Sequence, residues 1–144
     1  MASVFNVAKF ILQECGTMST MKLEKLTYYC QAWSLAWDDK PLFDEDFEAW
    51  ANGPVCPELF AKHKGRFIVD ESFLSSVEDC EFTKDELETM NSVIDYYKDE
   101  TPHYLSELTH QERPWKETRG NLPLGAPSNN VIPKELMREY YSGL

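Results

Sequence analysis

Residues 17–39, TMSTMKLEKLTYYCQAWSLAWDD, carry the strongest periodic pattern in the chain. Apolar side chains recur there at alternating steps of three and four, which is the spacing of one helix face. The positions are Leu23, Leu26, Cys30, Trp33 and Trp37. Further apolar residues widen this stripe, namely Met21, Tyr29, Ala32 and Ala36. A stripe of this width predicts a helix that is buried on more than one side.

The flanking sequence predicts further helices. Ser3 can cap and Gly16 can end a helix over residues 4–15, which we expect to pack against the central helix. Other helix starts are marked by Pro57, by the Thr83 and Glu86 capping box, by Thr101–Pro102 and by Pro133. The helix after Thr101 is expected to turn Tyr104 inward. RPWKETRG, residues 113–120, is expected to add one more helical turn, and DFEAWA, residues 46–51, a short strand.

These elements predict a mainly α fold. We expect residues 1–144 to form a single compact helical domain of about six helices, with a small central β or extended element; an α+β fold is the alternative. The chain has 144 residues, of which 42% are hydrophobic and 13% aromatic. That composition is sufficient for a buried core.

Charge and cysteine usage restrict the classes of partner. The formal net charge is −11 at pH 7, so direct binding to nucleic acid is not expected and a basic protein partner is favoured. No apolar run is long enough for a membrane span and the N-terminus lacks secretion-signal features, so we expect no membrane partner. The four cysteines have no zinc spacing. We therefore expect reduced thiols and a cytoplasmic protein.

The stretch FEAWANGPVCP, residues 47–57, is the main candidate for a functional site. Its Asn52-Gly53-Pro54 segment is typical of a built turn. Cys56 precedes an expected helix start and His63 follows seven residues later, so a Cys/His hydrolase is one hypothesis. The favoured alternative is that Cys56 is a small buried apolar residue, because no catalytic cysteine signature surrounds it. No metal site or cofactor is expected, since the histidines lack metal-ligand spacing.

Aromatic residues supply a second hypothesis. Adjacent tyrosines on a helix point in different directions, so one member of each pair is expected near the surface. The pairs are Tyr28–Tyr29, Tyr96–Tyr97 and Tyr140–Tyr141. Exposed tyrosine and tryptophan rings commonly anchor protein interfaces. The alternative is that these rings form the rim of the core.

The order of motifs along the chain resembles the Panacea domain, which is found in SocA-like antitoxins and phage-associated proteins. The matching motifs are K-L-x-K-L-x-Y-Y at 22–29, P-L-F-D-E at 41–45, E-A-W at 48–50, G-P-V-x-P-E-L at 53–59, LSELTHQERPWKE at 105–117 and IPKELMREYY at 132–141. Cys30 and Cys56 depart from the small apolar residues usual at their positions. That departure weakens the case for a catalytic Cys56.

The resemblance implies a function in bacteria or phages. Members are typically antitoxins that neutralise a toxin encoded by a neighbouring gene through direct protein–protein binding. At least one kind of member also acts as an adaptor that delivers its toxin to a protease, which is the main alternative. Neither role is enzymatic.

Within this resemblance, we expect the turn region to contact the partner. The expected partner-binding residues are Trp50, Asn52, Gly53, Pro54 and Val55, with Tyr29, Trp115 and Lys116 as possible neighbours. A residue that precedes proline is displaced from helical geometry, and glycine tolerates the conformations that result. A purely structural role is the alternative for each of these residues, and it is favoured for Trp115.

Overall fold

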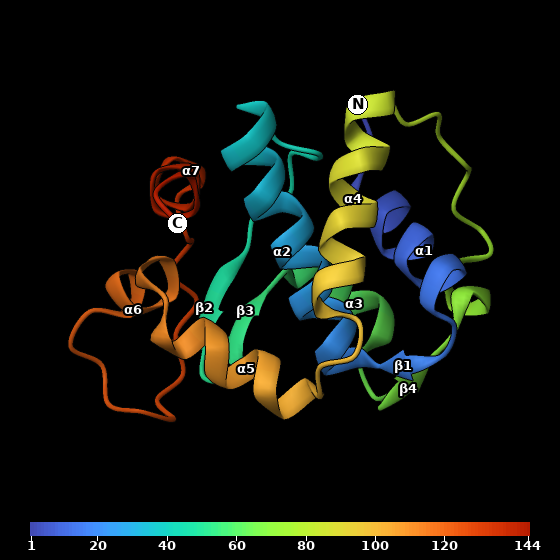
Figure 1. Cartoon of the computed structure of the whole chain (residues 1–144). Helices are drawn as coiled ribbons and strands as arrows, with labels where there is room; N and C mark the ends of the chain where they lie inside the picture. The colour runs from blue at the N-terminus through green and yellow to red at the C-terminus, as the bar shows by residue number, and fades with distance from the viewer.

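The computed structural model describes residues 1–144 and is mainly helical (Figure 1). Helix α2 (Thr20–Asp38) runs through the middle, where α1 (Val4–Cys15), α4 (Lys84–Tyr97) and α7 (Lys134–Ser142) pack around it. Three shorter helices complete the fold: α3 (Pro57–His63), α5 (Pro102–Gln111) and α6 (Arg113–Arg119). The predicted fold class is confirmed, with seven helices where about six were expected.

Polar side chains on α2 are buried because the loop that follows the helix satisfies them. The amide of Gln31 donates to the carbonyl of Phe43 at 2.8 Å and accepts from the backbone N–H of Leu42 at 2.7 Å. Ser34 Oγ donates to the carbonyl of Lys40 at 2.8 Å. These bonds fold residues 40–43 back along the helix. The predicted burial of this helix on more than one side is confirmed.

The predicted helix starts at Ser3, Thr83 and Thr101 are confirmed by side-chain caps, whereas α3 starts at Pro57 and α7 directly after Pro133 without one. Ser3 and Thr83 both form capping boxes, with Asn6 and Glu86 respectively. Gly16, which ends α1, has a φ of 79°. These caps could be predicted without knowledge of tertiary contacts, because a cap satisfies the free N–H groups of its own helix.

Two small antiparallel sheets stand beside the helices. β1 (Met18–Ser19) pairs with β4 (Ile68–Val69), and β2 (Glu48–Trp50) pairs with β3 (Gly53–Val55). The predicted strand in DFEAWA is therefore confirmed. The turn lies at residues 51–52 rather than at 52–54, since Gly53 and Pro54 belong to the second strand of this hairpin.

The tyrosine pairs differ from one another. Tyr96 is exposed and Tyr97 is buried, as predicted. Tyr28 and Tyr29 are both buried, so the prediction is wrong for this pair. The reason is that α2 is covered on several sides: the Tyr28 hydroxyl, for example, lies 3.1 Å from that of Tyr141 on α7.

Two aromatic residues expected to point inward do not. Trp37, in the last turn of α2, and Tyr104, on α5, are both about half exposed. They line a groove that also involves α4. None of the helices combines the length and the apolar character needed to cross a bilayer.

Candidate partner-binding site

The β2–β3 hairpin is held in place by side chains from α5 and α6. Ser106 Oγ donates to the carbonyl of Asn52, and Trp115 Nε1 donates to the carbonyl of Trp50 at 2.8 Å. Both contacts join segments more than fifty residues apart in the chain. The motifs that carry the family resemblance at 48–59 and 105–117 therefore meet in space.

Gly53 allows the hairpin to lie directly on α2. Its φ is +116°, a conformation that side-chain-bearing residues rarely adopt. A Cβ atom at this position would lie 2.6 Å from Lys25 Cε and 2.9 Å from Thr109 Oγ1. The backbone conformation therefore favours glycine, and a Cβ atom would in addition force the Lys25 and Thr109 side chains to shift.

Trp115 is part of the scaffold that supports the hairpin. Its ring stacks on His110 with centroids 4.1 Å apart, and the Arg119 guanidinium lies 4.9 Å from the ring centroid. Arg119 also donates to the carbonyl of Ala49 at 3.1 Å. Lys116 is exposed beside this cluster. The structure therefore places Trp115 behind the hairpin rather than at its outer surface.

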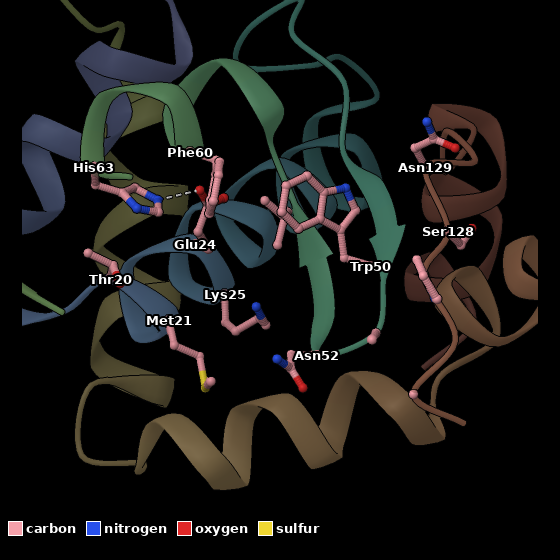
Figure 2. A pocket seen from close by; sticks show the side chains of 14 residues that line it. Thr20, Met21, Glu24, Lys25, Trp50, Asn52, Phe60, His63, Ser128 and Asn129 are labelled. Atoms are coloured by element: carbon pink, nitrogen blue, oxygen red, sulfur yellow. Dashed lines mark hydrogen bonds and ion pairs between the residues drawn. The ribbon is translucent and has the colours of Figure 1, made fainter. Parts of the chain in front are cut away.

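A pocket of about 620 Å³ opens between the hairpin, the first turns of α2, α3 and the loop before α7 (Figure 2). We call it the turn pocket. Three predicted residues line it, namely Trp50, Asn52 and Val55. The sequence analysis missed most of the others, which are Thr20, Met21, Glu24, Lys25, Ala51, Phe60, His63, Gly125, Pro127, Ser128 and Asn129.

Glu24 joins α2 to the start of α3. Its Oε2 lies 2.7 Å from His63 Nε2, and its Oε1 accepts from the backbone N–H of Cys56 at 2.9 Å. Both side chains of the Glu24–His63 pair are buried. Figure 2 shows this pair on one wall of the turn pocket. With both carboxylate oxygens engaged, Glu24 has a structural role in fixing the orientation of α3.

Lys25 is the unusual side chain of the turn pocket. The residue is only 1% exposed, and no hydrogen bond or ion pair within the protein includes its ammonium group, which keeps contact with solvent at the pocket. Burial lowers the pKa of Lys25 to about 8, although the nearby Glu24 carboxylate acts in the opposite direction. In Figure 2 its side chain extends between Trp50 and Asn52. A largely buried cation without a partner in the protein is costly.

The Cys/His arrangement proposed for a hydrolase is not formed. His63 is bound to Glu24 rather than to Cys56. Cys56 is buried, and that burial raises the pKa of its thiol. A nucleophilic cysteine needs the opposite shift. The structure also contains no group of three or more His, Cys, Asp or Glu side chains arranged to hold a metal ion.

Of the remaining predicted residues, Tyr29 lies in the core. It is fully buried, and its hydroxyl donates to Glu112 at 2.8 Å. Pro54 is buried in the hairpin, where it pairs with Ala49. The structure thus brings Trp50, Asn52 and Val55 together at a surface pocket, whereas Tyr29 and Pro54 are buried and do not line it.

Comparison with protein families identifies the chain. Residues 23–116 match the model for the antitoxin SocA-like, Panacea domain, which covers more than half of the sequence. The chain belongs to this family. The match includes α2 from Leu23 onward, the hairpin and Trp115, and therefore most of the groups that build the turn pocket. Family membership suggests an antitoxin and a non-enzymatic role. Comparisons with curated proteins and with solved structures gave no match.

Proposed function

We propose that this Panacea-domain protein neutralises a protein toxin by binding it directly, and that the toxin places an acidic group in the turn pocket against Lys25. The observation that carries the proposal is the Lys25 side chain, which is 1% exposed and has no hydrogen bond or ion pair in the protein, in a pocket that is open at the surface. Family membership supports a toxin as the partner.

The energetics favour a carboxylate as the group that enters. The free protein bears the desolvation cost of the Lys25 cation without any compensating ion pair. A carboxylate from the partner would form a charge-assisted hydrogen bond with Lys25, and the docked partner would exclude water from the pocket. The partner's carboxylate loses its own hydration on entry, so the contribution to affinity is the surplus of the ion pair over that cost.

The rim of the turn pocket is suited to a protein surface. Trp50 is half-buried, and its ring lies 4.9 Å from that of Phe60, while its indole N–H donates to Glu48. Asn52 is exposed beside it and can bond to a partner backbone. A rigid aromatic ring next to a buried charge is the composition expected of an interface hot spot.

Co-expression with the neighbouring gene tests the function. We expect the neighbour alone to arrest growth and this protein to relieve the arrest. Trp50→Ala is expected to weaken the rescue, whereas Phe67→Ala, which removes a ring that is exposed away from the turn pocket, is expected to leave it intact. Circular dichroism must show that both variants are folded. Rescue that is equal in all three proteins would contradict a role for this pocket.

The lifetime of the toxin separates direct neutralisation from the adaptor alternative. Neutralisation by binding predicts a stable complex in which the toxin persists at an unchanged level. An adaptor predicts that the toxin disappears faster when this protein is present, in a protease-dependent manner. A pulse-chase experiment on the co-expressing culture distinguishes the two.

A further inference from the structure

A second surface feature lies apart from the turn pocket, in the groove formed by the end of α2 with α4 and α5. It has a volume of about 680 Å³ and is lined mainly by hydrophobic side chains, five of them aromatic. We call it the aromatic groove and define it by Trp33, Trp37, Tyr96, Tyr97, Tyr104 and Glu112. Tyr96 is 77% exposed and Trp37 is 53% exposed. These rings are therefore not explained as parts of the core.

One buried carboxylate lies among these rings. Glu112 is 7% exposed, and its Oε1 accepts from the hydroxyls of Tyr29 at 2.8 Å and Tyr141 at 2.7 Å. Its Oε2 makes no hydrogen bond within the protein, and no cation pairs with it. Burial raises the pKa of Glu112, although both tyrosine hydroxyls act to lower it. The two hydroxyls orient the carboxylate, and one oxygen remains available.

The aromatic groove carries only negatively charged side chains. Its only charged lining residues are Glu100 and Glu112, and no lysine or arginine lines it. The whole chain carries a net charge of −11. Aromatic faces attract cations through their quadrupole, and a guanidinium group can stack on a ring while it donates to a carboxylate. The complementary ligand is therefore a planar cation on an apolar stem.

We propose that the aromatic groove binds an arginine side chain of the toxin, with the guanidinium group donating to Glu112 Oε2 and stacking against the groove's rings. The identity of the partner rests on the function proposed above, but the chemistry of the groove does not. This contact would be a second anchor, opposite in charge to the one at Lys25. The toxin would thus be recognised by one acidic and one basic side chain on separate surfaces.

A small-molecule titration tests the site without the toxin. The probe is N-acetyl-L-arginine amide, the matched control is its neutral citrulline analogue, and the readout is tryptophan fluorescence. We expect saturable quenching by the arginine compound and at least tenfold weaker binding of the citrulline compound. Equal binding of the two compounds, or no saturable signal with arginine, would overturn the proposal.

Matched variants locate the binding. Glu112→Gln keeps an oxygen acceptor for Tyr29 and Tyr141 but removes the charge, so we expect at least tenfold weaker binding of the arginine probe. Glu107→Gln removes an exposed acid of α5 outside the groove and should bind as the unchanged protein does. Thermal unfolding checks that both are folded, and nuclear magnetic resonance shifts of the groove tyrosines provide a second readout. Unchanged affinity in a folded Glu112→Gln variant contradicts the assignment.

The same variants then address the partner. In the co-expression assay, Glu112→Gln should weaken rescue and Glu107→Gln should not. If the neighbour proves not to be a toxin while the arginine probe still binds, the proposed function fails and the cation site stands. If rescue depends on Trp50 but the arginine probe does not bind, the proposed function stands and the cation site fails.

Discussion

At Lys25, burial of the side chain disfavours the charged form of its amine. The pKa of Lys25 is lowered from 10.5 to about 8 by burial, so the folded state holds this proton less tightly than the unfolded state does. Stability is therefore reduced while the pH lies below about 8, and it is recovered as the pH rises from about 8 towards 10.5. A group that makes the free protein less stable is a candidate for function, since functional sites commonly bear such costs.

Replacement of Lys25 tests this directly. Lys25→Met keeps most of the buried alkyl chain and removes the charge, so at pH 7 we expect stabilisation by up to about 3 kcal/mol. The advantage over the unchanged protein should shrink between about pH 8 and pH 10.5. Urea denaturation at several pH values measures both effects. A variant that is less stable at pH 7 would show that the ammonium group has a partner in the folded state.

A second prediction concerns Gly53, where a side chain would meet both an unfavourable backbone conformation and close neighbouring atoms. Gly53→Ala should destabilise the protein by about 2–4 kcal/mol, since it combines a positive φ with a Cβ only 2.6 Å from Lys25 Cε. Gly125 also has a positive φ, but the space around its Cβ position is open. Gly125→Ala should therefore cost only about 1 kcal/mol. Equal losses in thermal unfolding would indicate that backbone strain alone matters at Gly53.

The sequence predicted part of the candidate site at the level of residues. Trp50, Asn52 and Val55 could be predicted because they lie in a recognisable motif, and the structure places all three on the turn pocket. Lys25 and Glu24 were missed although they lie in the helix that was expected to be buried on several sides. A lysine and a glutamate within such a helix were a usable signal, because charged residues are rarely buried without a reason.

At the scale of elements, local signals and long-range contacts differed in how well they could be predicted. Helix boundaries followed from caps such as Ser3 and Thr83, whose partners lie within three residues. The turn was predicted at Asn52-Gly53-Pro54, because these residues are typical of a turn, but it lies at residues 51–52 and Gly53 and Pro54 belong to a second strand. The hairpin is held in place by Ser106 and Trp115, which are distant in sequence. No reasoning from local propensity could supply those contacts.

The support of the hairpin by α6 can be tested at Trp115. Trp115→Phe keeps an aromatic ring on His110 but removes the indole N–H that donates to the carbonyl of Trp50. We expect a loss of about 1–3 kcal/mol and faster amide hydrogen exchange in β2 and β3. The amides of α1, which Trp115 does not contact, serve as an internal control. Unchanged exchange in the hairpin would show that other contacts suffice to hold it.

At the scale of the whole molecule, the net charge of −11 should govern how fast a basic toxin is captured. We expect the association rate constant to fall at least tenfold when ionic strength rises from about 0.05 M to about 0.5 M. The dissociation rate should change less, because buried contacts are weakly screened. Stopped-flow fluorescence with the purified toxin measures both rates. An association rate that is independent of salt would indicate that charge does not guide the encounter.

The central claim is that the turn pocket binds the toxin through Lys25. The most direct measurement is the calorimetric affinity of the purified toxin for the unchanged protein, for Lys25→Met and for Lys64→Met, which removes an exposed lysine just after α3. We predict that Lys25→Met is folded, is more stable than the unchanged protein and binds at least tenfold more weakly. Lys64→Met should bind normally. A stable Lys25→Met protein that binds the toxin with undiminished affinity would contradict the account.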